Sequence, residues 1–204
     1  MDRSFQDKIA DVADVKHFDE AAALSKVERL FWRRGIASTG IQEVVAATGL
    51  SRSSLYNAFG GKDDLYATVV RRYLQHRSRP MFDRLASDGR GLTAVRAFFD
   101  RLLRLRCAGE FAGWGCLVSN ANAGDPPDAV RELLTEHHSA LRDAFAAALK
   151  VAQRNEELRS GVEVQDAAEL LTLLAYAVNL RSRSGATRAQ LKAAVSAALT
   201  GIAA

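Results

Sequence analysis

Proline and cysteine are both scarce in this sequence, and each absence narrows the class of protein. Its three prolines leave long stretches free to form uninterrupted helices, because proline removes a backbone donor and breaks helix interiors. Runs of β-branched or aromatic residues with period-two alternation are also lacking, which disfavours strands. Alanine and leucine are abundant by contrast. The composition therefore predicts an all-α chain.

The two cysteines, Cys107 and Cys116, are too few to form a disulfide framework. No HExxH motif and no spaced set of histidines and cysteines accompanies them, so we expect neither a metal site nor a cofactor. Cys116 and His138 could act together as nucleophile and base, but they lack a third orienting group and an oxyanion motif. We therefore expect no catalytic residues and no enzyme activity.

Long apolar runs are missing as well. No stretch of eighteen apolar residues occurs, which argues against a membrane span and a membrane partner. The first residues, MDRSFQDKIADVADV, have neither the basic flank nor the apolar centre of a signal peptide. We therefore expect a cytoplasmic protein, and its 48% hydrophobic content suffices for a sizeable core.

Positive charge is concentrated near the N-terminus. Residues 16–79 hold 11 lysines and arginines against 6 aspartates and glutamates, a difference of +5, whereas the net charge of the whole chain is +4. A basic segment suits a polyanion as partner, although solvated helix faces are often basic too. The near neutrality beyond residue 80 argues against a strongly charged small-molecule effector.

Four helices are predicted in the first third of the chain, after a flexible lead-in at residues 1–15. The first runs from about Phe18 to Gly35, where two arginines precede a glycine stop. Thr39 and Gln42 match a Ser/Thr-x-x-Glu/Gln capping box that opens the second helix.

A tight turn at Gly49 then separates the second helix from a third. Ser51 can cap this third helix over residues 52–59. The fourth, of about residues 62–80, follows two glycines and carries two aspartates in its first turn, where negative charge favours a helix N-terminus.

The pattern loosens over residues 83–91, which we interpret as a joint before a larger helical unit. Two capping boxes support the later helices, one at Asp166 with Glu169 and one at Thr187 with Gln190. The helices expected there span residues 92–107, 114–122, 127–154, 166–183 and 187–202.

Two short helices joined by a glycine turn and held by a longer helix make a helix-turn-helix, whose second helix enters the major groove of DNA. Arg52, Ser53 and Asn57 are expected to face outward from that helix and meet base edges, since Arg pairs with guanine and Asn with adenine. Hydroxyls near helix starts, and a lysine at a helix N-terminus, suit phosphate oxygens. The predicted DNA-binding residues are Thr39, Gln42, Ser51, Arg52, Ser53, Ser54, Tyr56, Asn57 and Lys62.

The segment RGIASTGIQEVVAATGLSRSSLYNAFGGKDDL resembles the DNA-binding signature of TetR-type transcriptional regulators. The matching positions are Ala46, Gly49, Leu55, Tyr56, Phe59, Lys62 and Leu65. The resemblance covers about residues 18–75 and implies that Tyr56 and Lys62 contact phosphates. Gly60 and Gly61 depart from the family, where a proline or serine often precedes the lysine, and we expect them to loosen the joint before the fourth helix.

The last two predicted helices carry wide apolar faces rich in alanine, which allow close helix approach. Two such faces side by side suggest a self-complementary interface, in which two helices from each chain form a four-helix bundle with two-fold symmetry. The family resemblance implies the same. We therefore expect a homodimer through the two C-terminal helices, bound to a palindromic operator in double-stranded DNA.

Large apolar residues with a few polar groups lie between the joint and this interface, and they fit either an ordinary core or a pocket for a small molecule. The family resemblance implies the pocket, because its members commonly respond to small molecules. The candidate pocket residues are Phe98, Leu102, Phe111, Trp114, Cys116, Asn120, His138, Leu141, Tyr176 and Asn179.

The sequence thus predicts an all-α chain with an N-terminal three-helix helix-turn-helix domain at residues 16–65. A larger C-terminal domain at residues 66–204 binds a ligand and dimerises. We interpret the chain as a transcriptional regulator, a repressor that an effector releases from its operator. One alternative is an electrophile or redox sensor acting through Cys116, near a predicted helix start. Another is a helical small-molecule binding protein or enzyme with vestigial DNA binding.

Overall fold

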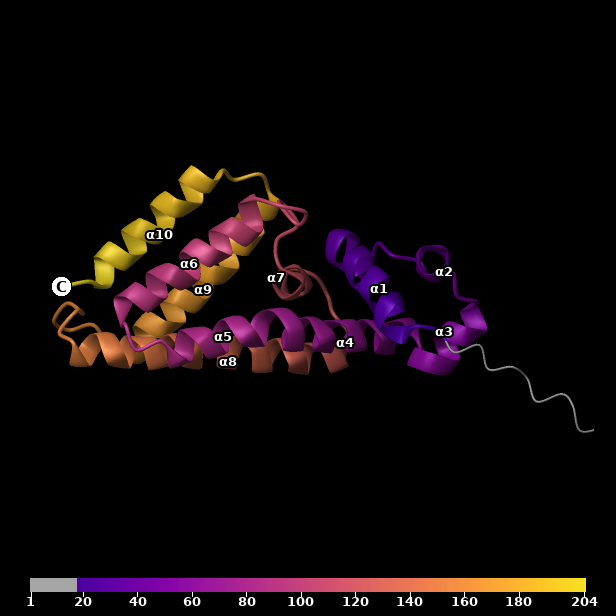
Figure 1. The fold of residues 1–204 in the computed structure, drawn as a ribbon, viewed down its shortest axis with the longest axis horizontal. Helices are drawn as coiled ribbons and strands as arrows, with labels where there is room; N and C mark the ends of the chain where they lie inside the picture. Colours follow the sequence, from indigo (N-terminus) through magenta and orange to yellow (C-terminus); the bar gives the residue numbers. More distant parts are fainter. Residues whose placement is uncertain (1–17) are drawn as a thin grey trace, which may run out of the picture.

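The computed structural model describes residues 18–204, so the expected flexible lead-in of residues 1–15 lies outside it. Over these residues the chain is helical, and its only β pairing is an isolated bridge between Leu158 and Ala203. Three short helices gather at one end of an elongated molecule, and a helical bundle fills the other end (Figure 1). None of the described helices combines the length and the hydrophobicity needed to cross a bilayer.

The N-terminal unit is built from α1 (Glu20–Arg34), α2 (Ile41–Thr48), α3 (Arg52–Phe59) and the start of α4 (Lys62–Tyr73). Side-chain caps open two of them: Asp19 accepts from the backbone N–H of Ala22 at 3.0 Å, and Ser51 accepts from that of Ser54 at 3.1 Å. The buried residues that hold the helices together are Val27, Phe31, Val44, Leu55, Leu65, Tyr66 and Val69.

The predicted cap of the second helix is wrong. The N-cap is Gly40, whose backbone N–H donates to the carboxylate of Glu43 at 2.9 Å. Thr39 lies one residue earlier and is buried, and its hydroxyl donates to the carbonyl of Gly35 at 2.7 Å. The helix therefore begins one residue later than the Thr39 capping box predicted, because Thr39 is buried in the preceding turn.

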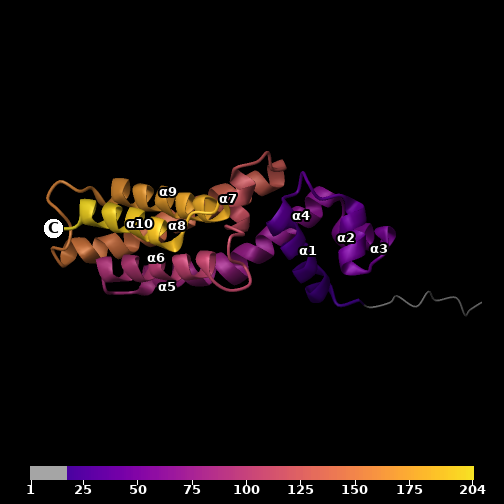
Figure 2. The same cartoon turned by 90° about the horizontal axis from the view of Figure 1, so that it is seen from above.

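One long helical rod connects the two ends of the molecule. The π-helical segment η1 (Leu74–Ser78) follows α4 directly and leads into α5 (Arg79–Ser87), and Figure 2 shows this rod entering the bundle. Pro80 lacks the N–H that an α-helical bond to the carbonyl of His76 would need, which accounts for a wide turn at this place. The rod extends beyond the predicted end near residue 80, because Phe82 and Leu85 are buried in the bundle core. Only residues 88–91 interrupt the helices of the predicted joint at 83–91.

The bundle contains α6 (Leu92–Cys107), α7 (Leu117–Asn122), α8 (Asp128–Arg154), α9 (Val164–Arg183) and α10 (Arg188–Ile202). The helix α8 lies along both α5 and α9, and α10 covers α6 and α9. The aromatic centre of the bundle consists of Phe98, Phe99 and Phe145, with ring centroids 4.9 to 5.7 Å apart. Burial of such rings supplies much of the free energy of folding of a bundle.

Two predicted helix starts are wrong and one capping box is confirmed. The helix expected from residue 114 begins at Leu117, because Gly113 and Gly115 adopt positive φ. Asp166 does not cap α9, which begins at Val164 with Glu163 at the N-cap. At α10, Thr187 accepts from the N–H of Gln190 at 3.3 Å, and the side chain of Gln190 accepts from the N–H of Thr187 at 2.9 Å.

Side-chain packing crosses the predicted domain boundary at residue 65. Cys116, Leu117 and Val118 of the α7 region share one buried cluster with Val27 and Phe31 of α1. The helix-turn-helix unit is therefore seated on α7 and on the adjoining part of α8, so movements of these elements and of α1 are physically linked.

Candidate DNA-binding surface and effector cavity

The helix α3 presents its polar residues at the end of the molecule opposite the C-terminus (Figure 1). Leu55 is 1% exposed and anchors the helix, which leaves Arg52, Ser53 and Asn57 exposed as predicted. Arg52 folds back on Tyr56, with its Nη2 donating to the tyrosine hydroxyl at 3.2 Å and its guanidinium carbon 5.3 Å from the ring centroid. This pair holds one candidate base contact beside one candidate phosphate contact.

The other predicted DNA-binding residues differ in whether DNA could reach their side chains. Gln42 and Ser51 are exposed, while Ser54 and Lys62 are half-buried at the starts of α3 and α4. Thr39 is 1% exposed and its hydroxyl is already bonded within the chain. The structure therefore contradicts the expectation that Thr39 faces outward to a phosphate, because it belongs to the interior of the turn before α2.

The two glycines before Lys62 form a defined turn, contrary to the expected loose joint. Gly60 has φ of 76°, and a Cβ at this position would lie 2.7 Å from a carboxylate oxygen of Asp64. That carboxylate accepts from the N–H of Gly61 at 2.9 Å and caps α4. The close approach of Asp64 thus requires glycine and fixes the N-terminus of α4, where Lys62 lies.

A cavity of about 220 Å³ lies where the rod, the bundle and α1 meet. Seven predicted pocket residues line it: Phe98, Leu102, Phe111, Cys116, Leu141, Tyr176 and Asn179. Trp32 of α1 and residues 76–78 of η1 also belong to the wall. The cavity therefore touches the helix-turn-helix unit, the connecting rod and the bundle at once.

Three predicted pocket residues lie outside this wall. Trp114 packs against Trp32 and Phe111, with ring centroids 5.7 and 5.3 Å away. Asn120 donates from its side-chain amide to the backbone carbonyls of Trp32 at 3.3 Å and of Trp114 at 2.9 Å. Both residues build the joint between α1 and α7 rather than the cavity.

His138 is the third of these residues, and the neighbouring histidine takes its predicted place. His138 is half-buried, stacks on Tyr176 and lies 3.2 Å from a carboxylate oxygen of Glu169. His137 points inward and lines the cavity, and its Nδ1 lies 3.2 Å from the hydroxyl of Tyr176. Burial, reinforced by the nearby His138, lowers the pKa of His137 to about 4, so His137 is neutral at neutral pH.

Arg106 is the main cavity residue that the sequence interpretation missed. Its side chain is 7% exposed, its Nε donates to the side-chain carbonyl of Asn179, and its Nη2 lies 3.5 Å from the hydroxyl of Tyr73. The Tyr73 hydroxyl in turn donates to the sulfur of Cys116 at 3.4 Å. A signal existed: Arg106 follows Leu102 and Leu103 by four and three residues, which places it on the buried face of α6.

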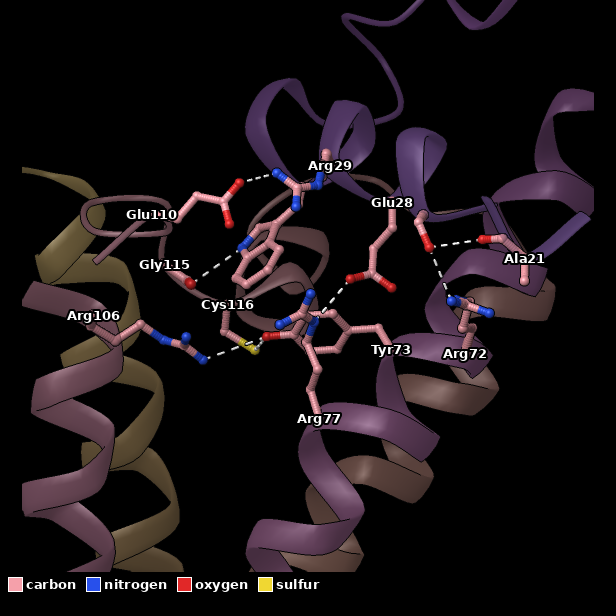
Figure 3. A network of polar contacts seen from close by, with 12 residues as sticks. Ala21, Glu28, Arg29, Arg72, Tyr73, Arg77, Arg106, Glu110, Gly115 and Cys116 are labelled. Atoms are coloured by element: carbon pink, nitrogen blue, oxygen red, sulfur yellow. Dashed lines mark hydrogen bonds and ion pairs between the residues drawn. The ribbon is translucent and has the colours of Figure 1, made fainter. Parts of the chain in front are cut away.

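Polar contacts join α1 to the rest of the molecule around this cavity (Figure 3). Trp32 donates from its indole N–H to the carbonyl of Gly115 at 3.2 Å, and Arg77 of η1 donates to the buried carboxylate of Glu28 at 2.9 Å. Arg29 pairs with Glu110 in the loop after α6. The orientation of α1, and with it the helix-turn-helix, depends on groups that border the cavity.

The helix α9 exposes an apolar stripe on its outer side. Leu170, Leu173 and Leu180 are 48%, 53% and 36% exposed, and Ala177 lies between them on the same face. The neighbouring α10 exposes Ala193, Ala194 and Ala197. These are the surfaces of the two C-terminal helices that the predicted dimer would bury.

A helix-turn-helix on a helical bundle that encloses a cavity is the architecture of a DNA-binding transcriptional regulator. Residues 23–69 match the family model for bacterial regulatory proteins of the tetR family. Residues 91–198 match the model for the tetracyclin repressor-like C-terminal domain. The chain belongs to this family, which confirms the resemblance seen in the sequence.

Known relatives align with this chain over most of its length. The transcriptional repressor ComR of Escherichia coli is 25% identical over 178 residues, which cover 86% of this chain and 85% of ComR. The uncharacterised regulator YezE of Bacillus subtilis is 29% identical over 144 residues, or 70% and 74% of the two chains.

Solved structures share the fold. A cysteine-substituted TetR-family regulator CifR, in complex with a 26-bp operator duplex, superposes with a TM-score of 0.80 at 23% identity, covering 91% of this chain and 97% of CifR. Reduced NemR of E. coli superposes with a TM-score of 0.76 at 20% identity, covering 90% and 97%.

Proposed function

We propose that this regulator is a homodimeric repressor that binds a palindromic operator and leaves it when a small molecule fills the cavity. The observation that carries the proposal is the composition of the cavity wall, which takes Trp32 from α1, Arg77 from η1 and Tyr176 from α9. A ligand there contacts the DNA-binding unit and α9, one of the two proposed dimerisation helices, at the same time.

The DNA contacts proposed are those that the geometry leaves available. Arg52, Ser53 and Asn57 of α3 read base edges, whereas Gln42, Ser51, Ser54, Tyr56 and Lys62 contact the phosphate backbone. Support comes from the exposure of the α3 residues and from the anchoring of α3 by the buried Leu55. Thr39 is left out because of its burial.

The dimer proposed is formed by α9 and α10 of two chains, within a C-terminal unit at residues 66–204. Exposed leucines on α9 and alanines on α10 supply the apolar surface that such a bundle buries. Two-fold symmetry spaces the two recognition helices along the axis of the duplex, so that the half-sites lie roughly 34–36 Å apart or somewhat more.

Release follows from a shift between two populations of the dimer. A ligand that favours one arrangement of α1 and the rod over the other changes the separation of the two recognition helices. Glu28 and Arg77 lie at this joint, and Trp32 forms part of the cavity wall, so the ligand has direct contacts through which to discriminate.

The experiment that tests this proposal is selection of genomic fragments by the purified protein at near-physiological salt, with excess nonspecific competitor DNA. Recovery of a palindrome is the expected result. Retention that is independent of sequence and disappears with salt would contradict the proposal and leave a small-molecule binding role for the cavity. A compound that binds the cavity without changing operator affinity would contradict the release mechanism alone.

A further inference from the structure

The cavity contains a buried cation without an anionic partner. The contacts of the Arg106 side chain, to the amide oxygen of Asn179 and the hydroxyl of Tyr73, are to neutral groups. Burial raises the pKa of Tyr73, which keeps that hydroxyl protonated. Within residues 18–204 no carboxylate forms an ion pair with Arg106. Removing an arginine from water without a counter-charge is unfavourable, so such a site is poised to accept an anion.

A second polar group of the same cavity is also left without a partner. Ser119 of α7 is 1% exposed, lines the cavity, and its hydroxyl makes no hydrogen bond in the described part of the chain. Buried hydroxyls are normally hydrogen-bonded, and an unpaired one therefore requires an explanation. A ligand oxygen would provide the missing partner.

The charges around the cavity are of one sign. Its lining contains Arg77, Arg101 and Arg106, and none of the lining residues is an aspartate or glutamate. Glu28 neutralises Arg77 from outside the lining, and Arg101 lies exposed at the rim. The deepest positive charge that remains uncompensated is therefore Arg106.

Apolar side chains form a large part of the wall and limit the size of the ligand. Phe98, Leu102, Phe111 and Leu141 provide hydrophobic and aromatic surface, as is usual in small-molecule sites. A cavity of about 150 Å³ accommodates benzene. The 220 Å³ found here fits one ring, or a short chain, together with a small polar group.

We propose that the effector is a small organic monocarboxylate whose apolar body fills the cavity and whose carboxylate is bound by Arg106 and Ser119. This inference rests on the proposed role of the cavity as the effector site and names the chemical class of the effector. It replaces the expectation from the near neutrality beyond residue 80, because the charge of the cavity wall differs from that of the chain segment.

The position of the carboxylate also gives it access to the DNA-binding unit. Arg106 bonds to Tyr73 of α4, and its guanidinium carbon lies 5.9 Å from the ring centroid of Trp32 in α1. An anion that draws the guanidinium toward itself therefore changes contacts of both helices. A neutral ligand of the same shape would form only weaker hydrogen bonds with Arg106.

The test is calorimetric titration of the dimer with benzoate, phenylacetate and hexanoate, each compared with its neutral primary amide. We expect at least one acid to bind and its amide to bind at least tenfold more weakly. The same acid should lower operator affinity.

Variants then assign the two contacts. Arg106→Gln and Ser119→Ala should each weaken binding of the acid at least tenfold. Arg104→Gln is the matched control, because Arg104 is exposed on the same helix and does not line this cavity. The affinity of this variant for the acid should not change. Ser119→Ala removes a hydroxyl that has no partner, so this variant is expected to fold even if Arg106→Gln does not.

The inference is wrong if none of the acids binds, if the amides bind as tightly as the acids, or if both variants retain full affinity for the acid. Each of these results leaves the proposed repressor intact as long as the genomic selection recovers a palindrome. Failure of that selection, with binding of an acid still abolished by Arg106→Gln, would instead contradict the repressor and leave the anion site standing.

Discussion

Arg77 of η1 donates a hydrogen bond from Nε to the carboxylate of Glu28 in α1, across 2.9 Å. The glutamate side chain is 7% exposed and the arginine 39% exposed, so the pair lies at the edge of the interior. It connects the wide turn of the rod to the helix that supports the helix-turn-helix. The cavity borders the same turn, so in the proposed mechanism this pair connects the ligand site to the helix that supports the helix-turn-helix.

Replacing Arg77 by methionine should destabilise the protein by about 1–3 kcal/mol, because it leaves the buried carboxylate of Glu28 without its charged donor. Thermal unfolding of the dimer measures the loss. Arg79→Met is the control, since Arg79 is exposed two residues along and forms no ion pair among the described residues. Equal stability of the two variants would show that the pair contributes nothing.

Arg52→Ala should change sequence preference at one base pair by about 1–3 kcal/mol. Lys62→Ala should weaken binding to all sequences alike and reduce the dependence on salt by about one phosphate contact. Binding measured on the operator and on single-base variants, at several salt concentrations, separates the two effects. A uniform loss for Arg52→Ala would mean that this arginine contacts only phosphates, as its contact with Tyr56 also permits.

Acidification should destabilise the protein through His137. Its pKa is about 4 in the folded protein, against 6.5 for an unperturbed histidine. Between these two values the unfolded chain binds a proton that the folded chain does not, so stability is present above pH 6.5 and falls as pH decreases toward 4. The loss amounts to roughly 3 kcal/mol at most.

Urea unfolding at a series of pH values tests this, with His137→Gln expected to flatten the profile. His76→Gln provides the control, because His76 is exposed. An unchanged slope in His137→Gln would assign the acid sensitivity to other groups.

Cys107 should react with iodoacetamide before Cys116 does. Cys107 is partly exposed, whereas Cys116 is 5% exposed beneath the hydroxyl of Tyr73. Mass spectrometry of the native protein measures the order of modification. Faster modification of Cys116 would favour the electrophile-sensing alternative, which also requires that Cys116→Ser keep operator binding and lose the response to electrophiles.

Leu173→Glu should convert the dimer into a folded monomer, because Leu173 is 53% exposed and its replacement costs the protomer little packing. Sedimentation measures the mass, and circular dichroism checks the fold. Thr93→Glu, on the exposed side of α6, is the control and should remain dimeric. A Leu173→Glu dimer would place the interface elsewhere.

The sequence predicted the helix-turn-helix well because local signals define it. Ser51 caps α3, and Gly49 adopts the left-handed conformation that ends α2. Errors arose where tertiary packing selects between local options. Thr39 has the chemistry of a cap yet is buried, and Asp166 has it too yet lies inside the first turn of α9.

The cavity was predicted in outline but not in its charged part. Apolar residues such as Phe98 and Leu141 follow from helical spacing, whereas the phase of α8 decides that His137 rather than His138 faces inward. Leu134 and Leu141 are buried on the same face as His137, so the phase was readable in principle. The role of Arg106 as a buried charge without a counter-ion depends on its neighbours in space. These neighbours cannot be read from residue spacing along one helix.

Trp32 and Trp114 are the two tryptophans of the chain, and both lie at the joint between α1 and the loop before α7. One contributes to the cavity wall, and the other packs against it. The tryptophan fluorescence of the protein therefore originates at the place where the proposed ligand site and the DNA-binding unit meet. Tryptophan emission is thus a built-in optical signal for the proposed change between two states, and no added dye is needed to follow it.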